Sequence, residues 1–272
     1  MKVKFFGTRG SMPICDCEFQ QFGGNTTCLW LTTDEGPSLI FDGGSGIRNL
    51  GKVLAARGVT DQPVVLLFTH FHWDHIQGLP FFAPAYNPAC QVTFCAFGRG
   101  KMFADLKSIF ETQMQRIYFP VPLDRMGAKL SFSQPDSEQF EHNGLQVTAR
   151  MHTHPGGAYS FRVEYGGKSV VLATDIEHMN GIDQGIVDLA RGADLLIHDA
   201  QFTPEELETH RGWGHSSWEQ AIEVGERAGA KRVALTHHDP DHDDVFLLEV
   251  EEKCKQRLPS VIVAREKQEI RV

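Results

Sequence analysis

Three histidines and one aspartate stand within six residues, in the run His70-Phe71-His72-Trp73-Asp74-His75. Neutral imidazole and carboxylate are the ligands that Zn²⁺, Mn²⁺ and Fe²⁺ share. A tight turn cannot point all four of these side chains away from one another. Such a pattern arises by chance in on the order of one comparable sequence in several hundred. The run therefore predicts a metal site rather than four unrelated surface residues.

Ligand-type side chains also follow three later apolar runs. His152-Thr153-His154 comes after one predicted strand, Asp175 ends the next, and His237-His238 follows a third. Each alone is a weak signal, since Asp and His at strand ends often cap loops. The carboxyl ends of buried strands, however, are where α/β proteins usually build their sites. Together these residues predict one shared centre.

Short β-rich runs and helical patterns alternate along the 272 residues, and no linker or low-complexity segment divides them. This organisation predicts one α/β (α+β) domain, residues 1–272, with mixed sheets covered by helices. The predicted strands are Lys2–Phe6, Thr27–Thr32, Ser38–Phe41, Val64–Phe68, Val92–Ala96, Leu145–Met151, Tyr159–Tyr165, Ser169–Ala173, Leu195–His198, Arg232–Thr236 and the closing strand Ser260–Ala264. The predicted helices are Ile47–Arg57, Lys101–Gln115, Gly185–Arg191, Ser217–Gly229 and Asp243–Lys255.

An insertion around residues 97–130 differs from the rest of the chain. It carries six Lys or Arg residues against three acidic ones, together with many aromatic and Met side chains. The first interpretation is an amphipathic helix that packs its aromatic face on the core. The second is a cap or a partner surface beside the active site. The sequence leaves the role of this insertion open.

The composition of the chain limits the classes of partner that we expect it to bind. The formal net charge is −9 at pH 7, which argues mildly against broad nucleic-acid binding because such binding needs clustered Lys and Arg. The chain reads directly into a strand rather than an apolar signal segment. No stretch approaches the ~20 apolar residues of a membrane span, and the six cysteines show no disulfide spacing. We therefore expect a cytoplasmic protein with no membrane partner.

The order of these motifs resembles the metallo-β-lactamase superfamily. Its hallmark is H-x-H-x-D-H after a strand, followed by a distant His, a bridging Asp and a last His. The resemblance covers essentially the whole chain and begins at Phe41-Asp42-Gly43-Gly44, which matches the acidic motif before the hallmark. It implies a four-layer αββα sandwich of two mixed β-sheets, with the metals at one sheet edge.

The resemblance also implies a dinuclear site and its ligands. The first metal would be bound by His70, His72 and His154, the second by Asp74, His75 and His237, and both by the bridging Asp175. Asp42 would orient a ligating histidine from behind, as metal-bound imidazoles generally require. His152 and His238 remain open as substitutes for His154 and His237. The implied cofactors are two divalent metal ions, Zn²⁺ first, with Mn²⁺ or Fe²⁺ as alternatives.

A second pair of loops narrows the reaction. Ile197-His198-Asp199-Ala200-Gln201 and Gly214-His215-Ser216-Ser217 resemble loops of the transfer-RNA 3′-processing nuclease and its phosphodiesterase relatives. There, an acid supports a His at the scissile phosphate, and these roles would fall to Asp199 and His215. The alternative is a helix-capping turn with a coincidental His. In the implied mechanism a metal-bridging hydroxide attacks phosphorus, Asp74 orients it, and His215 assists the leaving group.

The leading prediction is a metal-dependent phosphodiesterase acting on a small-molecule phosphodiester, with cyclic nucleotides as the first substrate class. The loops Gly7–Pro13 and Gly23–Thr27 resemble those of bacterial members of this branch. Their glycines let backbone amides approach an anion, which makes Arg9, Asn25 and Thr26 candidate substrate-binding residues. Tight turns that only shape the entrance are an equal alternative.

Three other functions compete with the predicted phosphodiesterase activity. The transfer-RNA 3′-endonucleases usually grip tRNA with a long arm between the third and bridging motifs. Here only Pro155 to Thr174 separates the two, so we expect no arm. We do not expect nucleic acid as the partner, although the basic insertion around residues 97–130 leaves a nuclease possible. Thioester or lactone hydrolysis on the same metals is a further option. A binding protein with a decayed site predicts missing ligands, yet all seven positions are filled.

Relatives are often dimers, so a homodimer is one expected assembly.

Overall fold

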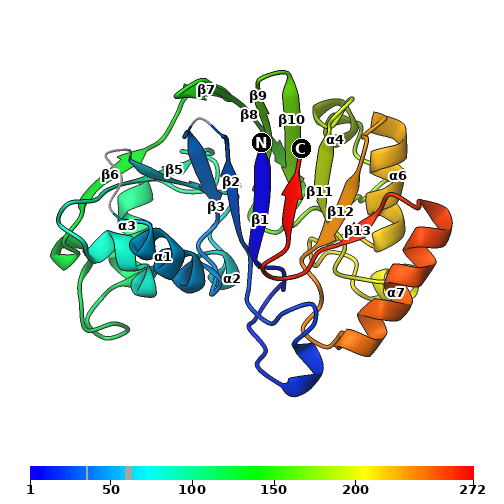
Figure 1. Ribbon diagram of the computed structural model, residues 1–272, viewed down its shortest axis with the longest axis horizontal. Coiled ribbons are helices and arrows are strands. Elements are labelled where there is room, and N and C mark those ends of the chain that lie inside the picture. The colour runs from blue at the N-terminus through cyan, green and yellow to red at the C-terminus, as the bar shows by residue number, and fades with distance from the viewer. Residues whose placement is uncertain (35, 59–62) are drawn as a thin grey trace.

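Two sheets face each other across the middle of the molecule (Figure 1). The structure, a computed structural model, describes residues 1–34, 36–58 and 63–272. In spatial order, the first sheet holds β14 (Glu269–Arg271), β1 (Lys2–Gly7), β2 (Cys28–Thr32), β3 (Ser38–Phe41), β4 (Val64–Phe68), β5 (Gln91–Ala96) and β6 (Lys129–Ser133). The second holds β13 (Ile262–Val263), β12 (Val233–Thr236), β11 (Leu195–Asp199), β10 (Lys168–Ala173), β9 (Ala158–Tyr165), β8 (Leu145–His152) and β7 (Gln139–His142).

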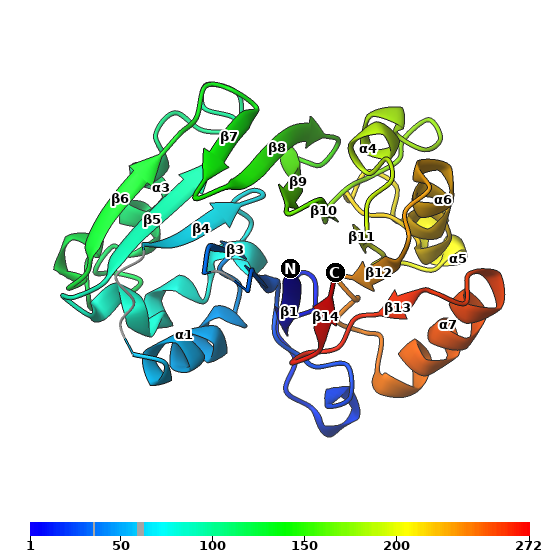
Figure 2. The same cartoon turned by 45° about the horizontal axis from the view of Figure 1, so that its top comes forward.

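Each sheet is mixed. In the first, pairing is antiparallel from β14 to β3 and parallel from β3 to β6. In the second, it is parallel from β13 to β10 and antiparallel from β10 to β7. The two termini lie side by side, because β1 and β14 pair at the edge of the first sheet (Figure 2).

The space between the sheets is filled by apolar side chains that point inward from both. Phe5, Leu31 and Leu67 come from the first sheet, and Phe161 and Leu172 from the second. Alternate residues of a strand point to one face, so the apolar positions of these strands set which face is buried. The resulting core holds the two sheets, and therefore their loop-bearing edges, in one fixed arrangement.

Helices cover the two outer faces. They are α1 (Ile47–Ala56), α2 (Trp73–Ile76), α3 (Leu106–Gln113), α4 (Gln184–Leu189), α5 (Pro204–Thr209), α6 (Trp218–Ala228) and α7 (Asp244–Arg257). Helices α1 and α3 pack on the first sheet, and α4, α6 and α7 on the second (Figures 1 and 2). The predicted four-layer αββα sandwich of two mixed sheets is confirmed.

Several boundaries differ from those predicted. The predicted helix Lys101–Gln115 begins only at Leu106, because the side chain of Asp105 caps it by accepting a hydrogen bond from the backbone N–H of Ser108. The closing strand is β14, not Ser260–Ala264, where β13 is only two residues long. The short strands β6 and β7 were not predicted. No helix among the described residues is long and apolar enough to cross a membrane.

Candidate metal centre

The proposed ligands lie in loops at the carboxyl ends of strands from both sheets. Three of the residues that end these strands, Asp42, Asp175 and His237, have positive φ angles of 59°, 57° and 66°. Left-handed backbone is uncommon for residues other than glycine, and such strain concentrates at functional sites. The chain therefore turns sharply where each of these side chains enters the centre.

One group of histidines comes from β4 and β8. Ligand atoms of His70, His72 and His154 all lie within 4.8 Å of one another. Nδ1 of His72 is 3.0 Å from Nε2 of His154. Nε2 of His70 is buried and has no hydrogen-bond partner. An unpaired imidazole nitrogen is costly to bury, and it suits a position that a cation would fill.

A second group lies directly beside the first. Ligand atoms of Asp74, His75, Asp175 and His237 also lie within 4.8 Å of one another. Oδ2 of Asp175 is 3.2 Å from Nε2 of His75, and Oδ1 of Asp175 is 3.2 Å from Nε2 of His237. Oδ1 is also 3.8 Å from Nε2 of His70 in the first group. The carboxylate of Asp175 thus faces both groups, as a bridging ligand must.

The electrostatics of the centre call for positive charge. Burial alone would lower the pKa of His237, but Asp175 and Asp74 overcome it and raise this pKa to about 9. Burial would also raise the pKa of Asp74, yet His75 and His237 hold it below its ordinary value. For His70, by contrast, burial lowers the pKa. The buried carboxylates thus favour positive charge in this centre, and imidazole together with carboxylate is a donor set that fits divalent ions.

Partners behind the ligands fix the imidazole orientations. Oδ2 of Asp42 lies 2.8 Å from Nδ1 of His75, so the ligand that Asp42 contacts is His75. Sequence reasoning did not assign two other partners: Oε1 of Gln201 lies 3.0 Å from Nδ1 of His237, and Nδ1 of His154 lies 2.9 Å from the carbonyl oxygen of Gly214. Such partners set which ring nitrogen keeps a free lone pair. Gln201 lies 36 residues before His237, and a lone glutamine at that distance carries no pattern that would have revealed this role.

The two open alternatives among the histidines have other partners. Nε2 of His152 is 3.0 Å from the carbonyl oxygen of Asp175, and its Nδ1 is 2.9 Å from Oγ of Ser160. Nε2 of His238 is 2.9 Å from the carbonyl oxygen of Ala264. Neither residue belongs to a possible ligand group in the described part of the chain. The geometry therefore favours His154 and His237.

Asp199 and His215 lie against the second ligand group. Nδ1 of His215 is 2.9 Å from Oδ2 of Asp199, and the ring of His215 stacks on that of His237 with centroids 4.9 Å apart. Asp199 also accepts hydrogen bonds from the backbone N–H groups of Asp175 and Ser216. One carboxylate thus holds both the backbone of Asp175 and the imidazole of His215.

The candidate substrate-binding residues are placed differently from the prediction. Arg9 is fully buried, and its guanidinium donates to the carbonyl oxygens of Gly23, Asp239 and His242. The side chains of Asn25 and Thr26 are engaged as well: Asn25 donates to Glu266 and accepts from Ser45, and Thr26 accepts from Gln77. The polar groups of Arg9, Asn25 and Thr26 thus hold the loops together, and substrate binding by these residues stays a prediction.

These loops still touch the centre, but through their backbone. The N–H of Ser11 donates to Oδ2 of Asp74 at 2.9 Å. A side chain at Gly10 would place its Cβ 2.3 Å from Nδ1 of His237. The glycine is thus needed for close approach to a ligand residue rather than to an anion.

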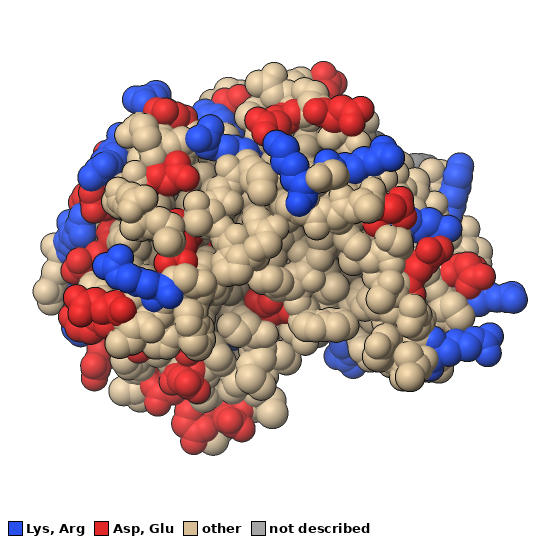
Figure 3. Space-filling view, turned by 180° about the vertical axis from the view of Figure 1, so that it is seen from behind, with Lys and Arg blue, Asp and Glu red and all other residues tan. Residues whose placement is uncertain are grey.

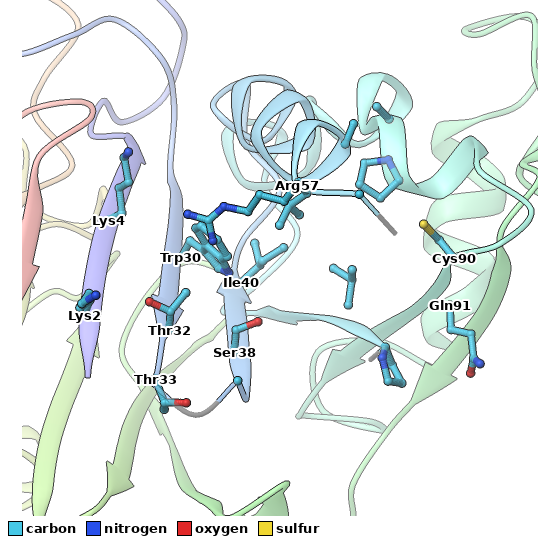
Figure 4. A pocket seen from close by; sticks show the side chains of 18 of the residues that line it. Lys2, Lys4, Trp30, Thr32, Thr33, Ser38, Ile40, Arg57, Cys90 and Gln91 are labelled. Carbon is cyan, nitrogen blue, oxygen red and sulfur yellow. The ribbon is translucent and has the colours of Figure 1, made fainter. Parts of the chain in front are cut away.

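A separate cavity of about 510 Å³ lies on the outer face of the first sheet, away from these residues (Figure 4). In it, the guanidinium of Arg57 stands 4.6 Å over the ring of Trp30, and Lys2 pairs with Asp34 at 3.5 Å. Its lining contains none of the proposed ligands, so it is not the reaction site.

Comparisons with known proteins agree with this geometry. A family model described as "Beta-lactamase superfamily domain" matches residues 37–238. A curated relative, Ribonuclease Z from Synechococcus sp. (strain CC9311), is 25% identical over 317 aligned positions that include 98% of this chain and 97% of the relative.

Three solved structures share the fold over nearly their whole lengths. They are the metallo-β-lactamase fold protein YhfI from Bacillus subtilis (TM-score 0.73, 20% identity, 99% of this chain and 98% of that one), the short form of human tRNase Z (0.71, 20%, 100% and 99%) and a diphosphatase from the PhnP family (0.69, 18%, 100% and 97%).

Proposed function

We propose that this chain, a metal-dependent hydrolase that belongs to the β-lactamase superfamily, cleaves phosphodiester bonds of nucleotides. The observation that carries the proposal is the contact of two ligand groups through Asp175, with the Asp199–His215 pair beside them. Two divalent ions, when bound, would supply a nucleophilic hydroxide at neutral pH and offset the charge of the phosphate. We propose Zn²⁺ as the resident ion, with Mn²⁺ and Fe²⁺ as alternatives.

The side chains around the ions would divide the remaining work. His70, His72 and His154 would hold one ion, and Asp74, His75 and His237 the other. Asp74 would also orient the nucleophile. His215 holds Asp199 through Nδ1, which leaves its Nε2 to donate a proton to the departing oxygen. Asp199 would stabilise the protonated imidazole until that transfer.

The relatives support a tRNA 3′ end as the substrate. Ribonuclease Z relatives match nearly the whole chain, and the short form of human tRNase Z shares the fold. From the sequence alone, we expect cyclic nucleotides ahead of this substrate. The comparisons support the two in the reverse order, and they give nucleic acid more weight as a partner than the net charge did.

A small phosphodiester is the second candidate, favoured by the segment between His154 and Asp175. That segment forms only the β9–β10 hairpin, whose strands are joined by Gly166 and Gly167. The alignment with Ribonuclease Z spans 317 positions against 272 residues, so at least 45 of them hold no residue of this chain. On the face shown in Figure 3, mostly uncharged residues cover the middle, an acidic group lies in the central hollow, and basic and acidic residues are interspersed toward the margins. The PhnP-family diphosphatase also shares the fold.

One set of assays separates these functions. Protein reconstituted with Zn²⁺, Mn²⁺ or Fe²⁺ is given precursor tRNA, 2′,3′- and 3′,5′-cyclic nucleotides, a bis-aryl phosphodiester and a thioester, with Asp175→Ala as the inactive control. Cleavage of precursor tRNA at its 3′ end supports the first candidate, and turnover of cyclic nucleotides alone supports the second. Thioester turnover without any diester cleavage would overturn the proposed function. Light scattering of the same preparations tests the proposed homodimer.

A further inference from the structure

Two of the four tryptophans are exposed, and both adjoin proposed metal ligands. Trp30 and Trp218 are buried in the core, whereas 65% of Trp73 and 61% of Trp213 are accessible to solvent. Trp73 directly follows His72, and Trp213 directly precedes the glycine whose carbonyl accepts from His154. Tryptophan carries the largest apolar surface of any side chain and is usually buried for most of its area. Two exposed indoles beside one centre therefore need an explanation.

The backbone at Trp213 is held from both sides by one buried carboxylate. Oε1 of Glu177 accepts from the N–H of Gly212 at 2.6 Å, and Oε2 accepts from the N–H of Gly214 at 2.9 Å. Both glycines have positive φ angles, of 87° and 92°. The N–H of Trp213 itself donates to the carbonyl oxygen of His210. This tripeptide is thus fixed by buried interactions, yet its only side chain points into solvent.

A series of aromatic and imidazole rings connects Trp213 with His215, the proposed general acid. The ring centroids of His215 and Phe202 are 5.9 Å apart, those of Phe202 and His210 are 4.6 Å apart, and those of His210 and Trp213 are 4.7 Å apart. The indole therefore stands at the outer end of a packed row that begins at His215. A leaving group that receives a proton from His215 would extend toward this row.

Trp73 stands near the same side of the centre. It begins α2 directly after His72, whose ring centroid is 4.9 Å from that of His154. Nδ1 of His154 is in turn 2.9 Å from the carbonyl oxygen of Gly214, next to Trp213. The two indoles are therefore carried by segments that meet at the His72–His154 contact. The His70–His75 segment contains neither Lys nor Arg, and Trp213 is preceded by one exposed arginine, Arg211. These segments therefore offer mainly rings, with a single positive charge beside Trp213.

We infer that Trp213, assisted by Trp73, stacks on a nucleobase of the substrate and makes the enzyme select nucleotide diesters over diesters without a base. The inference rests on the proposed function and names what that site recognises. Aromatic side chains bind every base through its flat face, so the selection is for the presence of a base and not for its identity. The base can come from a small cyclic nucleotide or from an RNA end.

The test compares two diesters that differ only in the base. For 2′,3′-cyclic AMP and the 2′,3′-cyclic phosphate of 1-O-methylribose, kcat/KM is measured in wild type, Trp213→Ala, Trp213→Phe and Trp73→Ala. We expect wild type to prefer the nucleotide by about tenfold or more, and Trp213→Ala to lose most of that preference. Trp213→Phe should keep most of it. The matched control is Tyr118→Ala, which removes an exposed aromatic ring (67% accessible) that contacts none of the proposed ligands, and it should leave the ratio unchanged.

Three outcomes would overturn the inference. The first is that wild type cleaves both diesters equally. The second is that Trp213→Ala slows the cleavage of both diesters equally, which would indicate a structural role. The third is that wild type prefers glycerophosphocholine, whose cation can also bind to aromatic rings. If wild type cleaves no diester, the proposed function fails instead. Titration with AMP then decides the inference independently, since binding should quench indole emission strongly in Trp73→Phe and much less in Trp213→Phe, and equal quenching in the two variants would contradict it. Precursor tRNA with an abasic residue beside the scissile bond distinguishes an RNA source from a small nucleotide.

Discussion

Nδ1 of His215 lies 2.9 Å from Oδ2 of Asp199, and the same oxygen accepts a hydrogen bond from the backbone N–H of Asp175. The acid–imidazole pair and the residue that faces both ligand groups are thus joined through one carboxylate. We therefore expect substitutions to separate the two proposed roles, because His215 belongs to the acid–imidazole pair whereas the side chain of Asp175 faces both ligand groups.

Replacement of His215 by Ala should lower kcat for a diester with a poor leaving group by about 100-fold or more, the usual contribution of a general acid. Metal content, measured by elemental analysis, should not change. The effect should shrink for an aryl diester, whose leaving group needs no proton. His142→Ala, at a half-buried histidine on β7, is the matched control. A His215→Ala protein with full activity on both diesters would show that His215 is not the acid.

Replacement of Asp42 by Asn should weaken metal binding by about 10- to 100-fold, because the carboxylate at 2.8 Å from Nδ1 fixes the ring of His75. Metal affinity is measured by competition with a chelator of known strength. Activity at saturating metal should recover most of its wild-type value. Unchanged affinity would mean that the contacts of Asp42 with the backbone N–H and hydroxyl of Thr69 are its only role.

Much of the fold was readable from the sequence because long apolar runs dominate it. Ser38–Phe41 and Val64–Phe68 were predicted at their observed bounds, since buried strands leave an uninterrupted apolar signal. β7 and β14 gave no such signal, because they are three or four residues long with polar side chains at alternate positions. β7 is a strand because it pairs with β8, and β14 is a strand because it pairs with β1. β1 lies at the other end of the sequence from β14, and the pairing of β7 with β8 is not evident before the fold is known.

The residues of the candidate metal centre also differ in how far the sequence predicts them. Residues that the chain places directly after apolar strands, such as Asp175 and His237, could be predicted because strand ends of one sheet edge converge. Gln201, Gly214 and Glu177 could not, since each acts through a single contact between loops that are distant in the sequence. The contacts of Arg9 could not be predicted for a related reason: a glycine-rich loop with an arginine looks the same in the sequence whether its guanidinium points to solvent or to three carbonyl oxygens.

The histidine pair at the end of β8 can be resolved by metal content. His154→Ala should reduce the bound metal from two ions per chain toward one, because His154 lies in the first ligand group. His152→Ala should retain both ions, since each of its ring nitrogens has a protein partner. It should instead lower the free energy of unfolding by about 1–3 kcal/mol, the usual cost of leaving a buried polar partner unpaired. The reverse result for metal content would exchange the two assignments.

Arg9 should matter for stability and not for substrate. Its guanidinium is fully buried and donates to three carbonyl oxygens, and burial lowers its pKa to about 10 without making it neutral at pH 7. Arg9→Met keeps the apolar stem but leaves these oxygens without a donor, so we expect the free energy of unfolding to fall by about 3 kcal/mol in urea denaturation. Arg48→Met, at an exposed arginine of α1, should change it by less than about 0.5 kcal/mol. Below its unfolding temperature, Arg9→Met should keep the wild-type KM for a diester. A stable variant with a strongly raised KM would return Arg9 to the substrate site.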